Sequence, residues 1–342
     1  MSQSENYADT SFAIALAELK KARDTHREFG RNIKLRCFFL EKDASAHQKL
    51  AEYADKAAEP GLEIRTLNKP LEEAIGEIAA FCAAGGSSNF SFIFIDPKGW
   101  TGFAMKTIQP LLRLNPGEVL INFMTSFVRR FVNMEESAAS FDQLFGSSKV
   151  RDAVGNLSGA DREDILISAY TERLKDAGNF KHAASAIVLH PQRDQTHFHL
   201  IYATRDDKGL EVFKNAEKKA MPFMENLRGA AQKRTRERRT GQSELFEEEE
   251  LPASAYFRKL RTRYTLEAKA KVRDLLQARG RMFYDDLWRI ALVFPMTWES
   301  DLKEWIVDWR KENLLRLQGM PAKARGPRRD SNVAVIWLGI KT

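Results

Sequence analysis

Short apolar runs alternate with longer amphipathic stretches over the first 125 residues. The runs at 35–40, 63–67, 91–95 and 119–123 have the length and apolar character of buried strands. Patterns typical of helices surround them, at residues 10–29, through Ala57, at 71–83 and at 102–114. The connections are long enough for right-handed crossovers, so this repeated alternation predicts an α/β domain with an open parallel sheet.

A second pattern begins after residue 160. A helical stretch at 161–178 is followed by two apolar runs, at 183–189 and 197–204, which are separated by the polar stretch PQRDQ and adjoining residues. A link this short does not allow a crossover, so the two runs predict an antiparallel hairpin at the edge of the sheet.

The composition changes from about Lys214 onward. A basic run, KRTRERRTG, is followed by an acidic one, ELFEEEE. Charge blocks of this kind rarely pack, so residues 214–255 are predicted to form a solvated, partly helical connector. Direct contact between the basic run and nucleic acid is the alternative interpretation.

The last 87 residues have a different pattern from the first 213. Helices are predicted at 264–279, 284–293 and 298–311, followed by strands at 314–317 and 333–338 that flank the basic loop PAKARGPRRD. Three helices followed by a hairpin with a basic tip are typical of a winged-helix domain, here over 256–342. In the third helix Trp298, Leu302, Trp305 and Trp309 repeat at helical spacing, which predicts a core stripe and not a stacking platform.

The totals agree with a folded protein of more than one domain. The chain has 342 residues, of which 43% are hydrophobic and 30% charged, which suffices for two cores, at 1–213 and 256–342. The two cysteines, Cys37 and Cys82, have no metal-type spacing, and no apolar run is long enough to cross a bilayer. With no signal pattern at the N-terminus, we expect a cytoplasmic protein that does not contact membranes and has no cysteine-bound metal.

Positive charge is concentrated near the C-terminus. Residues 253–342 hold 19 Lys and Arg against 10 Asp and Glu, whereas residues 1–150 hold 18 against 19. This asymmetry favours a local nucleic-acid surface over a uniformly basic protein, although an ordinary solvated face is the alternative. Because Glu304 and Asp308 lie on or beside the exposed face of the third helix, a winged helix that docks a protein also stays open. The candidate phosphate contacts are Lys303, Lys311, Lys323, Arg325, Arg328 and Arg329.

Four segments together resemble one family, the three-Cys-motif partner proteins (TcmP), whose main domain is methyltransferase-like. They are FFLEKD at 38–43, FIFIDPKGWTG at 92–102, EVLINFMTSFVRRF at 118–131 and FHLIYATRDDKGLEVFK at 198–214. The resemblance covers most of the chain, including YDDLW, ESDLKEW and RRDS near the C-terminus. It implies a Rossmann-like class I methyltransferase-type sheet, S-adenosylmethionine as cofactor, a bacterial or phage source, and a partner with a three-cysteine motif that looks like a radical-SAM relative.

The resemblance also assigns residues to the expected cofactor site. Glu41 stands where the family has the carboxylate that accepts hydrogen bonds from the ribose hydroxyls of the cofactor, and Asn68 follows the next strand, near the adenine. A surface carboxylate that only ends a strand is the alternative for Glu41. Asn68 is followed by Lys69 and Pro70, so the acidic residue that the family shows there is absent.

Asp96 and Pro97 stand at the place of the catalytic motif Asp/Asn-Pro-Pro-Tyr of amino-group methyltransferases. The resemblance therefore implies four candidate catalytic residues, Asp96, Pro97, Lys98 and Trp100, and Asp96 is also a candidate cofactor contact. In that motif the first polar residue and the following carbonyl hold the target nitrogen. This chain continues with Lys98, Gly99 and Trp100, so the second proline and the aromatic residue at the fourth place are missing. Trp100 offers a stacking surface one residue later, which suits an extruded base.

The family's first strand and glycine-rich cofactor loop have no counterpart before Glu41. The opening YADTSFAIALAELKKA resembles the segment that follows that loop, which indicates a truncated gene start or the loss of half the cofactor site. We therefore expect weak binding of S-adenosylmethionine, or none. Three functions stay open: a methyltransferase acting on nucleic acid, an inactive adaptor that binds nucleic acid or the three-Cys partner, and a protein-interaction scaffold.

Three histidines, His190, His197 and His199, fall on the predicted hairpin. Their imidazoles are common metal ligands. With no obvious carboxylate partner in the sequence, packing at the sheet edge is the favoured interpretation, and no metal site is predicted.

Overall fold

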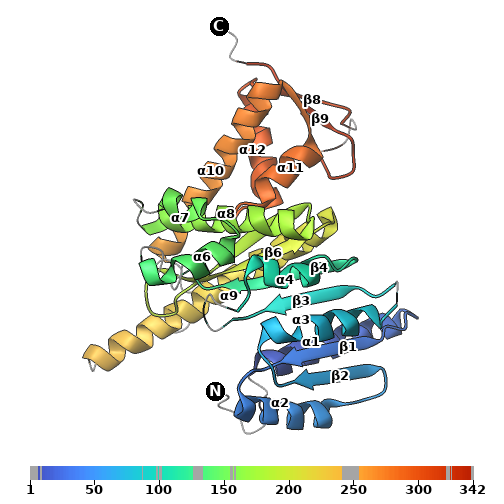
Figure 1. Cartoon of the computed structure of the whole chain (residues 1–342). Helices are drawn as coiled ribbons and strands as arrows, with labels where there is room; N and C mark the ends of the chain where they lie inside the picture. The colour runs from blue at the N-terminus through green and yellow to red at the C-terminus, as the bar shows by residue number, and fades with distance from the viewer. Residues whose placement is uncertain are drawn as a thin grey trace. The chain divides into compact units, whose positions relative to one another are not determined.

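The protein is a mixed α/β structure of two compact units, residues 1–89 and 90–342 (Figure 1). Each unit is described by itself. The computed structural model describes residues 7, 10–86, 88–97, 99, 102–125, 134–154, 157, 159–240, 254–320, 324 and 326–339.

The first unit is built around two parallel strands. Strand β1 pairs with β2 in register from Leu35 opposite Leu62 to Leu40 opposite Leu67. The carboxylate of Asp43 begins helix α2 by accepting a hydrogen bond from the Ala46 amide, at 2.8 Å. The elements are α1 (Ser11–Glu28), β1 (Leu35–Leu40), α2 (Ala44–Ala57), β2 (Leu62–Leu67) and α3 (Leu71–Ala83), close to the predicted ranges.

The second unit contains a mixed four-stranded sheet in the order β3-β4-β6-β5. Strands β3 and β4 are parallel, and β6 runs antiparallel to both of its neighbours. This confirms the predicted antiparallel hairpin next to parallel strands. The strands are β3 (Ser91–Ile95), β4 (Gly117–Phe123), β5 (His182–Leu189) and β6 (Thr196–Thr204).

Helices cover this sheet and supply an aromatic core. The Phe123 ring of β4 lies 4.6 Å from the Tyr170 ring and 6.3 Å from the Phe145 ring, measured between centroids. Arg205, just past β6, donates hydrogen bonds to four backbone carbonyls, including those of Leu112 and Gly178, so it ties helix ends to the sheet. The helices are α4 (Met105–Leu112), η1 (Glu135–Ser137), α6 (Ala138–Phe145), α7 (Lys149–Val154) and α8 (Gly159–Gly178).

The predicted connector is largely one helix. Helix α9 (Asp207–Thr240) has 34 residues, and Figure 1 shows it in yellow passing the sheet and extending beyond it. Its buried side chains include Lys214, Glu217 and Arg228. The interpretation of residues 214–255 as a solvated connector was therefore wrong for 214–228, because buried charges there pair with one another and with backbone groups.

The C-terminal part continues the same unit. Strand β7, which the sequence pattern did not reveal, joins β8 and β9 in an antiparallel sheet of order β7-β9-β8. The elements are α10 (Ala255–Arg279), β7 (Arg281–Phe283), α11 (Tyr284–Leu292), α12 (Glu299–Lys311), β8 (Leu315–Gln318) and β9 (Ala334–Trp337).

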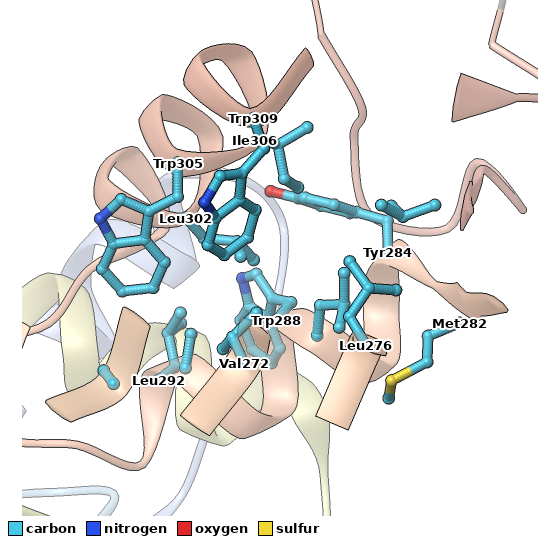
Figure 2. Close-up of a cluster of buried hydrophobic side chains, with 14 of the residues drawn as sticks. Val272, Leu276, Met282, Tyr284, Trp288, Leu292, Leu302, Trp305, Ile306 and Trp309 are labelled. Carbon is cyan, nitrogen blue, oxygen red and sulfur yellow. The ribbon is translucent and has the colours of Figure 1, made fainter. Parts of the chain in front are cut away.

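Three residues of the predicted apolar stripe, Leu302, Trp305 and Trp309 of α12, lie in the core as predicted, whereas Trp298 directly precedes the helix and is only half-buried. Figure 2 shows Trp305 and Trp309 beside Trp288 of α11 and Leu276 of α10. The same cluster includes Ala184 of β5 and Leu210 of α9, so the C-terminal helices and the four-stranded sheet share one core. This shared core explains why the compact units divide near residue 89 and not within 214–255.

Among the described residues, none of the helices combines the length and the apolar character that crossing a bilayer requires.

Candidate functional site

In the first unit, the structure brings together two of the three predicted cofactor residues, Glu41 and Asn68, whereas the third, Asp96, belongs to the second unit. Glu41 directly follows β1, and Asn68 directly follows β2. The Asn68 side-chain amide donates to the Glu41 carbonyl at 2.8 Å, and Oε1 of Glu41 accepts a hydrogen bond from the Asp43 amide at 2.9 Å. Both residues therefore lie at the carboxyl edge of a parallel strand pair, where open α/β sheets bind ligands.

These residues fit part of an adenosyl ligand. The Glu41 carboxylate can accept the hydroxyl donors of a ribose, and the Asn68 amide can face a base edge. Only one glycine, Gly30, precedes Glu41 in the sequence, so no glycine-rich stretch is present there to let backbone amides approach the rest of the ligand. The fit therefore covers the adenosine half of the predicted cofactor.

In the second unit, Asp96 ends the parallel strand β3 and has a specific partner. Its Oδ1 accepts a hydrogen bond of 2.7 Å from Nδ2 of Asn122, which is in β4. The register explains the contact. Ile95 of β3 pairs with Ile121 of β4, so the residues that follow them, Asp96 and Asn122, lie side by side. Asp96 is exposed, and Pro97 directly after it is half-buried.

Unsatisfied polar atoms surround this strand edge. Among the described residues, the Oδ1 atom of Asn122 and the Oγ1 atom of Thr125 are buried and have no hydrogen-bond partner. Buried polar atoms without partners cost free energy, and others occur elsewhere among the described residues, such as the Tyr170 hydroxyl and Nε1 of Trp288, so these two atoms alone do not mark a site. The sequence signal for Asn122 was a polar residue inside the apolar run VLINF, and sequence reasoning did not use it.

Two of the four predicted catalytic residues, Lys98 and Trp100, lie outside the described residues. The same holds for two predicted phosphate contacts, Lys323 and Arg325.

The remaining predicted phosphate contacts have different surroundings. Lys303 pairs with Glu299 at 2.7 Å, and Lys311 lies 3.9 Å from Asp308 and is 74% exposed. Arg328 is exposed.

Arg329 makes contacts inside the protein. Its guanidinium pairs with Glu211 of α9 at 3.1 Å and lies 4.3 Å from the centre of a Trp288 ring. Only 17% of its side chain is exposed. The structure thus gives Arg329 a packing role in place of the surface position expected for a phosphate contact.

A cavity that sequence reasoning missed lies between the β5–β6 hairpin and helices α8 and α10. It has a volume of about 290 Å³. His199 lines it, and the Nε2 atom of His199 lies 2.8 Å from Oε1 of the buried Glu163. The Nδ1 atom of the same ring is buried without a partner. The expectation that this histidine lacks a carboxylate partner was therefore wrong, since Glu163 is 36 residues away in sequence and invisible to a local pattern.

Two further cavity residues are linked by a hydrogen bond. The Tyr264 hydroxyl donates to Asp164 at 2.7 Å. Burial raises the pKa of Asp164 and outweighs the hydrogen bond from Tyr264 and the nearby charge of Arg263. Ring contacts place His190 beside His197, at 5.4 Å between centroids. Among the described residues, no three His, Cys, Asp or Glu side chains are arranged to hold a metal ion.

No family model, no curated protein and no solved structure matches this chain. Any assignment of function therefore has to come from the residues and geometry above.

Proposed function

We propose that the protein is a cytoplasmic, methyltransferase-type protein of the TcmP kind that acts on nucleic acid and works with a three-Cys-motif partner. The observation that carries the proposal is the hydrogen bond between Asp96 and Asn122 at the carboxyl ends of two parallel strands. The Rossmann-like, class I methyltransferase-type interpretation of the fold belongs to the same proposal. It is supported by parallel strands followed by an antiparallel hairpin.

The hydrogen-bond acceptors at the carboxyl ends of β3 and β4 suit an amino group as the methyl acceptor. Asn122 holds one oxygen of the Asp96 carboxylate, and the other can accept a hydrogen bond from an amino N–H. The Pro97 carbonyl, one residue on, is a second acceptor for the same group. Bound S-adenosylmethionine would supply an electrophilic methyl group. Asp96 and Pro97 hold and orient the acceptor nitrogen, and such positioning is a large part of catalysis for transfers of this kind.

The C-terminal elements support the nucleic-acid part of the proposal. Helix α10, strand β7, helices α11 and α12 and the pair β8–β9 follow one another in the order of a winged-helix domain, with β9 between β7 and β8. Exposed Lys311 and Arg328 are its described phosphate contacts. Outward-facing Glu304 and Asp308 on α12 favour backbone contact by the loop and strands over base reading by the helix.

A second candidate is a catalytically inactive adaptor that binds nucleic acid or the three-Cys partner. The observation that favours it is that Lys69 and Pro70 follow Asn68, so the acidic residue that the family shows there is absent. For the same reason we expect the polypeptide as given to bind S-adenosylmethionine more weakly than micromolar, and calorimetry that gives micromolar binding would refute this.

Methyl transfer separates the two candidates. Tritiated S-adenosylmethionine at near-millimolar concentration is incubated with the full chain and pooled DNA or RNA oligonucleotides, and incorporated label is counted. We expect transfer that falls about 100-fold in Asp96→Ala, because the target nitrogen loses an oriented acceptor. Asp274→Ala removes a carboxylate that is 64% exposed and serves as the matched control.

The outcomes distinguish the candidates. Unchanged transfer in Asp96→Ala would reject Asp96 as a catalytic residue. If the wild-type chain binds the oligonucleotides but labels none of them, the adaptor is the correct function.

A further inference from the structure

The last three turns of helix α9 have an unusual composition for a helix. Residues 232–240 read QKRTRERRT and contain no aliphatic or aromatic side chain. After Arg228, no residue of α9 is buried. In Figure 1 this end of the helix, in yellow, extends beyond the sheet. Packing against the core therefore does not account for this segment, which we call the α9 tip.

The α9 tip concentrates positive charge. Residues 233–239 hold five basic side chains and one acidic one. Arg234, Arg238 and Arg239 are exposed and form no ion pair with any residue that the structure describes. Arg234 and Arg238 are four residues apart, so two like charges face the same side of the helix and destabilise it. Cations interact favourably with a helix C-terminus, which explains the arginines in the last turn of α9. It does not explain Arg234, which precedes that turn.

The helix therefore carries charge that a polyanion would neutralise. We infer that the α9 tip is a nucleic-acid-binding surface that grips the phosphate backbone. Phosphate contact needs only cations at short repeated spacing, which a helix with arginines at i and i+4 provides.

Two other partners fit less well. Protein interfaces gain most of their affinity from buried aromatic and aliphatic anchors, and the tip has none. Helices that lie on membranes need an apolar face, which is absent for the same reason. This inference deepens the proposed function and rests on it for the class of partner, but it adds a surface outside the predicted winged-helix contacts.

Fluorescence anisotropy of a labelled 20-base-pair duplex, titrated with the full chain at several salt concentrations, tests the inference. The tip variant combines Arg234→Ala, Arg238→Ala and Arg239→Ala. We expect its affinity at 0.1 M salt to fall at least about tenfold. The slope of log affinity against log salt should lose about 2.7, which is about 0.9 for each of three phosphates released.

A control variant removes the same charge elsewhere in the second unit. It combines Arg173→Ala, Lys219→Ala and Arg273→Ala, all of which change exposed side chains. We expect its salt slope to stay near that of the wild type. Because both sets of positions are exposed, circular dichroism and thermal unfolding should show that both variants fold.

Polyglutamate of matched charge and vesicles containing phosphatidylserine are tested as competitors of the duplex. If either competes as well as unlabelled duplex, the partner is an acidic protein or a membrane, and the inference is overturned. Equal affinity of the tip and control variants also overturns it.

The test is independent of catalysis. Loss of binding in the tip variant, together with no methyl transfer by the wild type, keeps the tip as a nucleic-acid surface and rejects the enzyme. If a variant with Lys311→Ala and Arg328→Ala loses binding while the tip variant does not, the winged-helix proposal stands and the tip is rejected.

Discussion

The first two-thirds and the last third of α9 are both rich in charge but use it differently. Over 207–228 the charged residues include Lys214, Glu217, Glu225 and Arg228, all of which are buried. Over 229–240 no charged residue is buried. Apolar residues such as Met221 anchor the first part to the core, whereas the last part has only two small ones, Ala230 and Ala231. Charge density alone thus does not decide whether a helix is solvated.

The buried charges of α9 are matched by partners from other elements. Lys214 forms an ion pair with Glu217 and donates to the Phe294 carbonyl at 2.8 Å, while Glu217 accepts from the Met296 amide at 2.9 Å. Burial lowers the pKa of Lys214 despite the opposing charge of Glu217. These contacts join α9 to the connection between α11 and α12, so they hold the C-terminal helices on the sheet.

The largest effect is expected from breaking this pair. Glu217→Ala leaves the Lys214 ammonium buried without its partner, which should lower the free energy of unfolding of the second unit by about 3 to 5 kcal/mol. Urea unfolding followed by tryptophan fluorescence measures the change. A loss of unfolding free energy below about 1 kcal/mol would show that the Lys214 ammonium reaches solvent in the variant. The two parts of α9 would then not differ in how they use charge.

A smaller, pH-dependent effect is expected at the beginning of α9. Burial alone would raise the pKa of Asp207, but hydrogen bonds from Arg289, Lys181 and His182 outweigh it and hold this pKa below its ordinary value. A carboxyl group whose pKa is lower in the folded state than in the unfolded state stabilises the fold at pH values above its unfolded-state pKa. That stabilisation is lost as the pH falls through its folded-state pKa.

Asp207→Asn should therefore cost about 2 kcal/mol at pH 7, as expected for hydrogen bonds to a charged group, and progressively less below about pH 4. Urea unfolding at pH 7, 5 and 3 gives the difference between variant and wild type. A difference that does not shrink with falling pH would contradict the assigned role of this carboxylate.

The smallest effect is expected at the α9 tip. Replacing Arg234, Arg238 and Arg239 with alanine should change the free energy of unfolding by less than about 0.5 kcal/mol, because these side chains contact no described core residue. A slight gain in stability is expected, because the repulsion between like charges is removed and alanine has a high helix propensity. The same urea experiment checks this, and a loss near that of Glu217→Ala would show that the tip packs against the protein.

In the candidate sites, too, the sequence located some residues but not the distant residues that they contact. The resemblance to the TcmP family assigned roles to Glu41, Asn68 and Asp96, and the structure confirms that each directly follows a strand. Their partners were not identified, because Asn122 meets Asp96 only through the register of β3 and β4. Glu163 meets His199 only because α8 packs beside the hairpin.

By itself, the sequence determined most of the strands and helices, although not β7. Short apolar runs specify strands, and the tryptophans of α12 at helical spacing specify a core face, because both signals depend on neighbours along the chain. The lengths of the connections also predicted the parallel pairs β1–β2 and β3–β4 and the antiparallel hairpin. The prediction of one open parallel sheet of buried strands was wrong, because β1 and β2 form a two-stranded sheet of their own, and Phe92 and Phe94 of β3 are exposed.

Only the tertiary structure decided which charges of α9 are buried, that Arg329 packs on Trp288, and that the C-terminal helices share a core with the sheet. Such outcomes depend on partners that are far apart in the sequence, by as much as 80 residues for Lys214 and Phe294. A buried charge is tolerated only where such a partner is supplied, and no local pattern contains that information.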